Sequence, residues 1–333
     1  MLFYKDLENI VFTRNQIVPC DELVVISGYV GPTPVSKLGT LPIKSTVIYG
    51  MYGSDGIRVK LHDALLEQSK KLTQTQILYS TTPVHSKCYV WRNKNKVVAS
   101  LIGSANFSTN GLTTPFKEVL AESSVDTFEA LNDYIELVIK QSIPCEKAKI
   151  SDSKQRIVTE AIEPSYQEGV APMPLYILEA GQKVIPERSG LNWGMAKLTG
   201  SHVCINDAYI PIRADLVKHY PEIFPSKQDE PIDTSTGKKQ RHNDAIEILW
   251  DDGTTMVGLL EGNLRQVKNG VAVKYPKQIA SHPTKKLMGV YLRERLGVPE
   301  GQAIKYSDLA RYGRDTIDIS LQGEGIYFFD FSV

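Results

Sequence analysis

The sequence has 333 residues, which at roughly 150 residues per domain predicts about two domains. Hydrophobic residues make up 42% and charged residues 23% of the chain, so the composition excludes wholesale disorder, a fibrous repeat and a disulfide-stapled miniprotein. Lysine plus arginine and aspartate plus glutamate both total 38. The formal charge is therefore zero, and any surface for nucleic acid has to be local.

The cysteines and the N-terminal segment indicate the compartment. Cys20, Cys88, Cys145 and Cys204 form no C-x-x-C pair, which argues against a zinc site and against a disulfide framework. The opening MLFYKDLENIVF lacks the basic region of a signal peptide, and no apolar run has the length of a membrane span. We expect a cytoplasmic protein with no membrane partner and no bound metal.

The first half of the chain has the rhythm of an α/β domain. Helical spacing predicts helices over residues 57–71 and 123–141, and the Gly/Pro-rich segment 31–42 predicts a loop. Short apolar runs predict buried strands at residues 21–30, 44–53, 75–80, 87–91 and 96–104. We place this α/β domain at residues 1–150.

The second half changes character after a proline-rich connection, which we assign as a linker at residues 151–174. Helical segments are expected at 213–224 and 285–297. Strand-like runs are expected at 174–179, 202–212, 245–250, 255–262, 271–279, 316–321 and 325–332. Many strands with two helices predict a mostly β, barrel-like domain over residues 175–333.

One histidine carries a pattern suited to phosphodiester chemistry. His85 is followed two positions later by Lys87, and residues i and i+2 of an extended strand point to one face, so a nucleophile and a phosphate clamp emerge together. The next strand ends in G-S-x-N, which presents Ser104 and Asn106, and Glu118 follows as a group able to hold an imidazole N–H. A lone H-x-K in a strand is more often incidental; the conjunction favours an active site.

These residues resemble the H-x-K…G-S-x-N signature of the phospholipase D superfamily of phosphodiesterases. Arg92 stands where the usual motif has an aspartate, and the Gly-Ser pair comes later than usual. The superfamily's nuclease branch lacks that aspartate and uses a later glutamate, whose place Glu118 takes.

Members of this superfamily need two such motifs for one active site. The other five histidines lack the partner lysine. The resemblance therefore implies a homodimer through the nuclease domain, with a composite site, a covalent phosphohistidine, and no metal or cofactor.

Two segments of the second half, 181–202 and 263–277, are rich in residue types that read DNA. The second contains Arg265, Lys268, Lys274 and Lys277 without an acid, and 237–243 is also acid-free. A solvated surface is the plain alternative for each.

We interpret Asp251-Asp252-Gly253 as a hairpin turn rather than a metal site, and Tyr312-Gly313-Arg314 as support for the barrel.

The stretches SGLNWG, NDAYIPI, WDDGT, LLEGN, YLRERLGV, LARYGR and YFFDFS resemble the C-terminal DNA-recognition domain of NgoFVII-type and BfiI-type restriction endonucleases. That domain is a pseudobarrel related to the B-three domain of plant transcription factors, and the first half resembles the nuclease domain of the same enzymes. In this family two arms reach into the major groove, and 181–202 and 263–277 take their places. The contacts so implied are Asn192, Trp193, Lys197, Asn263, Arg265, Gln266, Lys268, Asn269 and Lys274.

For Trp193 the alternative is that its ring packs the arm against the barrel.

The expected function is a type II-like, site-specific restriction endonuclease that cleaves double-stranded DNA. Some relatives work with a separate helicase-like ATPase subunit; the sequence itself contains no P-loop, G-x-x-x-x-G-K-[ST]. Two alternatives stay open: a non-specific nuclease or lipid phosphodiesterase of the superfamily, and a sequence-specific DNA-binding protein with a degenerate nuclease domain. The Arg92 departure keeps the second alternative open.

Overall fold

The computed structural model describes residues 1–150, 169–196, 203–227, 243–268 and 271–333. The chain divides into two compact units, Met1–Val158 with Gln322–Ile326, and Thr159–Leu321 with Tyr327–Val333. Most of the predicted linker 151–174 and of the basic segment 237–243 lies outside the described residues. None of the helices in the described ranges is long and apolar enough to cross a membrane.

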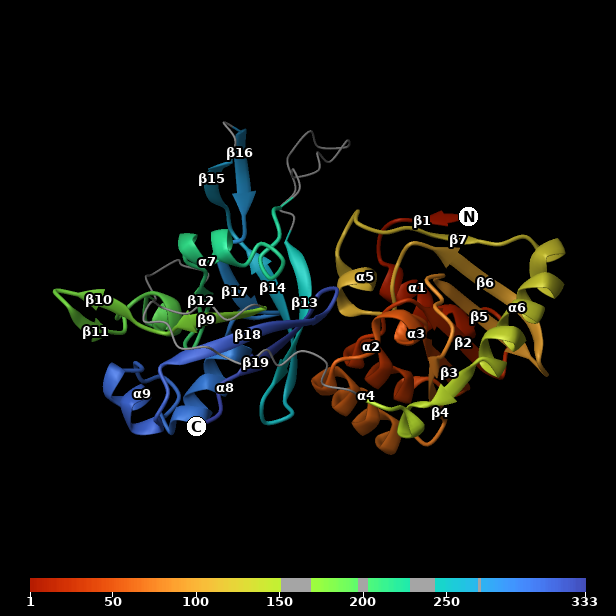
Figure 1. Ribbon diagram of the computed structural model, residues 1–333, viewed down its shortest axis with the longest axis horizontal. Coiled ribbons are helices and arrows are strands. Elements are labelled where there is room, and N and C mark those ends of the chain that lie inside the picture. Colours follow the sequence, from red (N-terminus) through yellow and green to blue (C-terminus); the bar gives the residue numbers. More distant parts are fainter. Residues whose placement is uncertain (151–168, 197–202, 228–242, 269–270) are drawn as a thin grey trace. The chain divides into compact units, whose positions relative to one another are not determined.

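The first unit contains an eight-stranded mixed sheet in the order β1-β7-β6-β5-β2-β3-β4-β8 (Figure 1). The central strands β2, β3 and β4 are parallel, whereas β5, β6 and β7 continue the sheet in antiparallel pairs. Residues 23–26 of β2 are fully buried, as expected for a strand covered on both faces. The strands are β1 (Leu2–Phe3), β2 (Glu22–Ser27), β3 (Lys44–Tyr49), β4 (Thr75–Ser80), β5 (Cys88–Asn93), β6 (Lys96–Gly103), β7 (Leu120–Glu122) and β8 (Ser142–Pro144).

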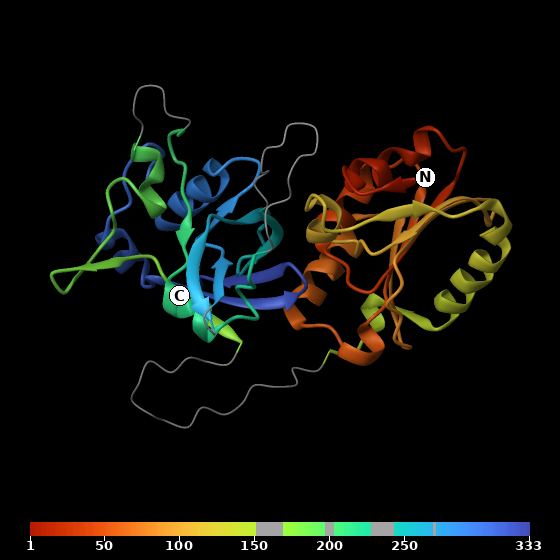
Figure 2. The same ribbon diagram turned by 90° about the horizontal axis from the view of Figure 1, so that it is seen from above.

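The longest helices of this unit bury apolar residues at helical spacing. Helix α6 (Phe128–Lys140) buries Leu131, Ile135 and Val138, spaced at helical intervals, against one face of the sheet (Figure 2). The other helices of this unit are α1 (Leu7–Thr13), η1 (Arg14–Gln16), α2 (Pro32–Lys37), η2 (Leu38–Thr40), α3 (Tyr52–Asp55), α4 (Val59–Lys71), α5 (Thr109–Thr113), η3 (Val125–Thr127) and η4 (Cys145–Lys147).

The predicted helices over 57–71 and 123–141 are confirmed in shorter form, and the predicted strands of this unit are confirmed, except that the strand predicted at 44–53 ends at Tyr49 and the chain then turns into α3. The loop predicted at 31–42 is wrong, because α2 lies within it. Pro32 occupies the first turn of this helix, where its missing N–H costs no hydrogen bond.

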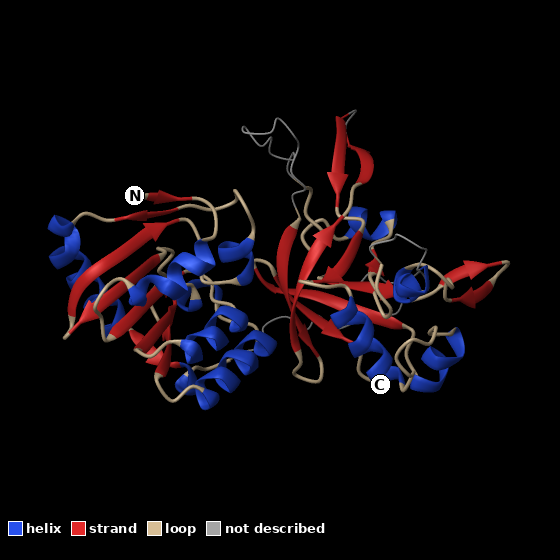
Figure 3. Ribbon diagram, turned by 180° about the vertical axis from the view of Figure 1, so that it is seen from behind, coloured by secondary structure: helices blue, strands red, loops and turns tan. Residues whose placement is uncertain are grey.

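The second unit is mostly β, as Figure 3 shows by its colouring. A seven-stranded sheet in the order β12-β17-β14-β13-β19-β18-β9 encloses a core that includes Trp250, Phe329 and Phe331. Its strands are β9 (Val170–Pro174), β12 (Ile210–Pro211), β13 (Asp244–Trp250), β14 (Thr255–Glu261), β17 (Gln278–Ser281), β18 (Thr316–Gly323) and β19 (Ile326–Asp330). Its helices are η5 (Gly190–Ala196), α7 (Ala214–His219), α8 (Lys286–Leu296) and α9 (Tyr306–Tyr312).

Two hairpins project from the body of the second unit (Figure 1). One consists of β10 (Ile177–Glu179) and β11 (Gln182–Val184), the other of β15 (Leu264–Lys268) and β16 (Val271–Tyr275). The sequence predicted neither β15 nor α9, and the strand expected over 202–212 is reduced to β12. Both helices predicted in this half, at 213–224 and 285–297, are present in shorter form as α7 and α8.

Candidate active site and DNA-recognition surface

His85 and Lys87 lie in the extended segment that leads into β5. The His85 side chain is exposed, whereas Lys87 is 6% exposed. The Lys87 ammonium lies 3.0 Å from Nδ1 and 3.1 Å from Nε2 of His85 and donates to the His85 carbonyl at 2.7 Å. Burial lowers the pKa of Lys87. A buried ammonium beside an imidazole gains from an anion, so the pair is suited to a phosphate.

Asn106 is fixed beside this pair by the end of β2. Its Oδ1 accepts hydrogen bonds from the Ser27 hydroxyl at 3.3 Å and from the Tyr29 backbone N–H at 3.2 Å. The Ser27 hydroxyl also accepts from the Phe107 N–H at 2.9 Å. Asn106 is 6% exposed. The amide therefore has one fixed orientation at the edge of the sheet.

Gly28 lies next to both His85 and Asn106. A Cβ atom placed on Gly28 would lie 3.0 Å from Cδ2 of His85 and 3.5 Å from Oδ1 of Asn106. Three segments far apart in the sequence, after β2, before β5 and after β6, thus meet around one glycine. Ser27, Gly28 and Tyr29 belong to no predicted motif; the available signal was a buried strand that ends in S-G-Y.

Ser104 and Glu118 lie at the other side of Asn106. The Ser104 hydroxyl accepts from the Val119 N–H at 3.1 Å, and the Ser104 N–H donates to the Val119 carbonyl at 3.0 Å. Within the described residues Glu118 makes no hydrogen bond to His85, which is the bond expected from the sequence. Its negative charge acts on Lys87, whose pKa it raises against the larger opposing effect of burial.

Arg92, the departure from the usual motif, is a structural ion-pair centre. Its guanidinium contacts Glu22 of β2 at 2.6 Å and Glu136 of α6 at 2.6 Å, and its side chain is 6% exposed. It lies five positions along the chain from Lys87, with four residues of β5 between them. Arg92 therefore ties α6 to the sheet and takes no place in the His85 cluster.

In the second unit, the β15–β16 hairpin carries several of the predicted DNA contacts. Arg265 is exposed and stands opposite Lys274 in the register of the two strands. Asn263 is exposed at the base of the hairpin, and the Gln266 amide donates to the Ala214 carbonyl at 2.7 Å. The backbone of Lys268 lies in β15, and Asn269 lies outside the described residues. The hairpin is a basic two-stranded ribbon, a shape that the DNA major groove admits.

The other predicted arm has a different construction. Asn192 is 1% exposed; its Oδ1 accepts from the Ile304 N–H at 2.8 Å, and its Nδ2 donates to the Pro186 and Ile304 carbonyls at 3.1 and 2.8 Å. These bonds favour a structural role over a DNA contact. The Trp193 ring packs edge-on against Tyr209, with centroids 5.8 Å apart. Lys197 lies outside the described residues.

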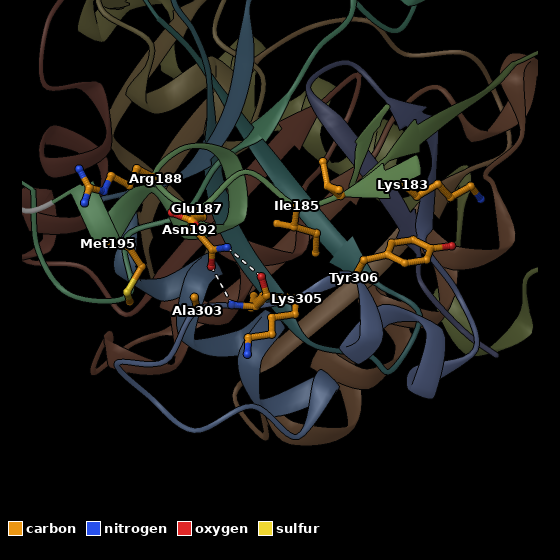
Figure 4. A pocket seen from close by; sticks show the side chains of 11 residues that line it. Lys183, Ile185, Glu187, Arg188, Asn192, Met195, Ala303, Lys305 and Tyr306 are labelled. Atoms are coloured by element: carbon orange, nitrogen blue, oxygen red, sulfur yellow. Dashed lines mark hydrogen bonds between the residues drawn. The ribbon is translucent and has the colours of Figure 1, made fainter. Parts of the chain in front are cut away.

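A pocket of about 550 Å³ opens between β11, η5 and the segment before α9 (Figure 4). Tyr306 forms part of its wall, and Lys183, Arg188 and Lys305 surround it. Asp315 already binds Lys183 at 2.8 Å. Arg188 and Lys305 remain exposed at the rim and add positive charge beside the first arm.

The comparisons with known proteins agree with this division of the chain. Residues 5–152 match the family model described as the NgoFVII restriction endonuclease N-terminal PLD domain, and residues 168–322 match the NgoFVII C-terminal B3-like DNA-binding domain. The chain belongs to the NgoFVII restriction endonuclease family. It is a restriction endonuclease with a phospholipase D-like nuclease domain followed by a B3-like DNA-binding domain. No curated protein sequence matches it.

Solved structures resemble the nuclease half of this endonuclease only loosely. NucT from Helicobacter pylori is 16% identical and covers 43% of this chain and 97% of its own, with a TM-score of 0.33. Nuc from Salmonella typhimurium, a phospholipase D family member, is 12% identical and covers 41% of this chain and 87% of its own, with a TM-score of 0.28. Polyphosphate kinase from Porphyromonas gingivalis is 11% identical and covers 41% and 21%, with a TM-score of 0.29.

Two motifs of the DNA-binding domain have structural roles. Asp251 and Asp252 lie in the turn between β13 and β14, as predicted, and both pair with Arg295 of α8, at 2.9 and 3.3 Å. Arg314 pairs with Asp318 and Asp330 at 2.8 and 3.0 Å. The first pair of contacts ties α8 to the turn, and the second ties the segment before β18 to β18 and β19, which agrees with the predicted support for the barrel.

Proposed function

We propose that this restriction endonuclease hydrolyses double-stranded DNA at specific sites by a metal-independent phosphohistidine mechanism, in an active site shared by two copies of the chain. The assembly of His85, Lys87 and Asn106 around Gly28 carries the proposal. The sequence contains one H-x-K motif, whereas the chemistry calls for a nucleophile and a separate general acid.

A patch of exposed apolar side chains supports the homodimer. Leu2, Ala121 and Ile102 are register neighbours across β1, β7 and β6, and Leu2 and Ile102 are 60% and 38% exposed. Phe116 and Val119 extend this surface with 38% and 40% exposure, and Val119 is bonded to Ser104 of the site. Apolar side chains gathered at one edge mark a protein contact. We propose that a second copy docks here and that the His85 side chains of the two copies act on one phosphate.

The reaction proceeds in two displacements. In the first, His85 attacks phosphorus in line; a P–N bond forms and the bond from phosphorus to the leaving oxygen breaks, while the partner subunit's His85 gives that oxygen a proton. In the second, the partner's His85, now neutral, takes a proton from water. The hydroxide attacks phosphorus, the P–N bond breaks, and both histidines return to their starting forms.

The cluster around His85 supplies the charge that this chemistry needs. The Lys87 ammonium and the Asn106 amide face the developing charge on the non-bridging oxygens and stabilise it, as positioned donors do in other transfer reactions. Ser104 and Glu118 complete the proposed set: the Ser104 hydroxyl accepts from the N–H of Val119, next to Glu118 in the segment before β7, and the Glu118 carboxylate lies within electrostatic reach of Lys87.

Site specificity comes from the second domain. The β15–β16 ribbon would enter the major groove and present Arg265, Gln266 and Lys274, the side-chain types that contact base edges and phosphates. The first arm contributes Trp193 and Lys197, together with the exposed Arg188 and Lys305 at the pocket rim. A separate helicase-like ATPase subunit is the proposed further partner, and its support is the family resemblance alone.

Plasmid cleavage in excess chelator tests the proposal. The wild type is expected to give discrete fragments in chelator, and His85→Ala no fragments. Loss of wild-type cleavage in chelator contradicts the metal-independent mechanism, and equal activity of the variant contradicts the nucleophile. A smear in place of discrete fragments indicates a non-specific nuclease. Binding to a specific site without any cleavage indicates a degenerate nuclease domain.

A further inference from the structure

Tyr29 touches two of the proposed active-site residues and has no role in the mechanism above. Its ring stands edge-on to the His85 imidazole, with centroids 6.1 Å apart and an interplanar angle of 81°. Its backbone N–H donates to Asn106. Tyr29 is half-buried and follows directly on Gly28, the residue under the imidazole. Two adjacent residues therefore bound the His85 ring on two sides.

The far end of Tyr29 is anchored. Its hydroxyl donates to Oδ2 of Asp55 at 2.7 Å, and Oδ1 of Asp55 accepts from the Ser54 hydroxyl at 2.8 Å. The ring also packs edge-on against buried Tyr49, with centroids 6.1 Å apart. The hydrogen bond from Tyr29 lowers the pKa of Asp55, and the same bond raises the pKa of Tyr29 to about 12. At neutral pH the bond is therefore a phenol donating to a carboxylate, the stronger charge-assisted kind.

His85 has no such anchor of its own. Among the described residues its ring nitrogens contact only the Lys87 ammonium, and no carboxylate is bonded to them. Histidine catalysts are usually oriented by a carboxylate or carbonyl on the second ring nitrogen. Here the edge-on ring of Tyr29 and the absence of a side chain at Gly28 shape the space that the imidazole occupies.

We propose that Tyr29, anchored by Asp55, is a positioning residue that sets the orientation of the His85 imidazole for in-line attack. Tyr29 would thus orient the imidazole, the role that the sequence suggested for Glu118. The proposal rests on the proposed function of His85 as the nucleophile. Asp55 acts through Tyr29 and not on the substrate. Misplacement of a reacting group by about 1 Å can lower a rate on the order of 100-fold, so loss of the ring is expected to be costly.

Cleavage kinetics in chelator test the proposal with four variants. Tyr29→Ala is expected to lower kcat by about 10- to 100-fold with KM within about twofold of wild type, because DNA binding resides elsewhere. Tyr29→Phe keeps the ring and is expected to restore most of the rate. Asp55→Ala is expected to lower kcat by about threefold in the wild type and to have no effect in Tyr29→Ala, since both act through one ring.

Tyr52→Ala is the matched control. Tyr52 is a half-buried tyrosine of α3 that packs on Tyr79 with centroids 5.3 Å apart, and it makes no contact with His85. Its removal is expected to affect stability and leave kcat unchanged. An unchanged kcat in folded Tyr29→Ala overturns the proposal. A loss in Tyr52→Ala as large as in Tyr29→Ala also overturns it, because packing alone would then explain both.

A crystal structure of Tyr29→Ala separates this proposal from the proposed function. The His85 ring is expected to turn or to lose a single orientation, and a ring that stays as in the wild type overturns the positioning role. This result does not depend on activity. If the wild type cleaves no DNA, the proposed function fails while the orientation of His85 still decides the role of Tyr29.

Discussion

Gly28 lies so close to His85 that a single added methyl group would reach Cδ2 of the imidazole at 3.0 Å. Its backbone is not in the left-handed region, so the residue is required for space rather than for backbone conformation. The glycine and the histidine come from segments that are brought together by the pairing of β2 with β5 and by backbone hydrogen bonds that both segments make to Gly50–Met51.

Gly28→Ala should therefore lower cleavage without unfolding the protein. The added methyl group displaces the imidazole by a few tenths of an ångström, and we expect kcat to fall by about tenfold. Gly39→Ala is the control, since its methyl group would meet only the end of the flexible Leu72 side chain. Steady-state cleavage and thermal unfolding of both variants measure the effect. A fully active Gly28→Ala would show that the ring position is not critical.

Arg92→Ala should destabilise the nuclease domain and leave the chemistry of the folded fraction unchanged. Removing the guanidinium leaves the largely buried Glu22 carboxylate without its partner, which should cost about 2–4 kcal/mol of unfolding free energy. Arg92→Asp, which restores the residue of the usual motif, should be more destabilising because it places three carboxylates together. Urea unfolding measures both. Increased cleavage by Arg92→Asp would mean that this position belongs to the active site.

Asn192→Ala should act on stability rather than on DNA contact. The buried amide bonds to three backbone groups, and leaving these unpaired should cost about 2–3 kcal/mol. Asn263→Ala is the matched control: this asparagine is exposed, and its loss should change the unfolding free energy by less than about 0.5 kcal/mol. Chemical denaturation compares the two. Reduced DNA binding by Asn192→Ala at unchanged stability would restore the contact predicted from the sequence.

Arg265→Ala should weaken DNA binding and leave the fold intact, because the side chain is exposed on the β15–β16 ribbon. If Arg265 neutralises one phosphate, the slope of log K against log salt concentration should become shallower by about 1. Lys286→Ala removes a cation of α8 that is 53% exposed and should leave the slope unchanged. Titrations of labelled duplex at several salt concentrations provide the slopes. Equal slopes for Arg265→Ala and the wild type would remove Arg265 from the DNA contacts.

The Tyr29–Asp55 bond should give a pH-dependent contribution to stability. The hydrogen bond lowers the folded-state pKa of Asp55. A lowered carboxyl pKa stabilises the folded state above the ordinary pKa, and the contribution is lost as the pH falls through the folded value. Asp55 is exposed, so Tyr29→Phe should cost no more than about 1 kcal/mol at neutral pH. Urea unfolding from neutral to acidic pH should show the two proteins converging, and a constant difference would exclude the linkage.

Local patterns in the sequence predicted local features well. The helix at 57–71 and the strand at 75–80 follow from spacing alone, and the side-by-side placement of His85 and Lys87 follows from the alternation of an extended strand. The helix α2 was missed because its glycines and prolines are typical of a loop, although Pro32 suits the first turn of a helix.

The rest of the site depends on contacts between distant segments. Gly28 and Tyr29 reach His85 through the pairing of β2 with β5 and through backbone bonds to the segment after β3, which no local pattern specifies. Asn192 is of a residue type that often contacts DNA. Its burial and its hydrogen bonds to the backbone of Ile304, 112 positions along the chain, decide its role instead. The bond expected from Glu118 to His85 depends likewise on how the segment before β7 runs, and it is absent among the described residues.

A purified heterodimer of one wild-type and one His85→Ala subunit tests the shared active site most directly. The two subunits would be co-expressed with different tags and separated from both homodimers before plasmid cleavage in chelator. If each site needs both histidines, the heterodimer should be inactive. If wild-type and His85→Ala subunits are mixed in equal amounts and pair at random, about one quarter of the dimers are wild type, so about one quarter of the activity of an all-wild-type sample should remain. A heterodimer with about half the wild-type activity, or a strictly monomeric wild type that still cleaves, would contradict the shared site.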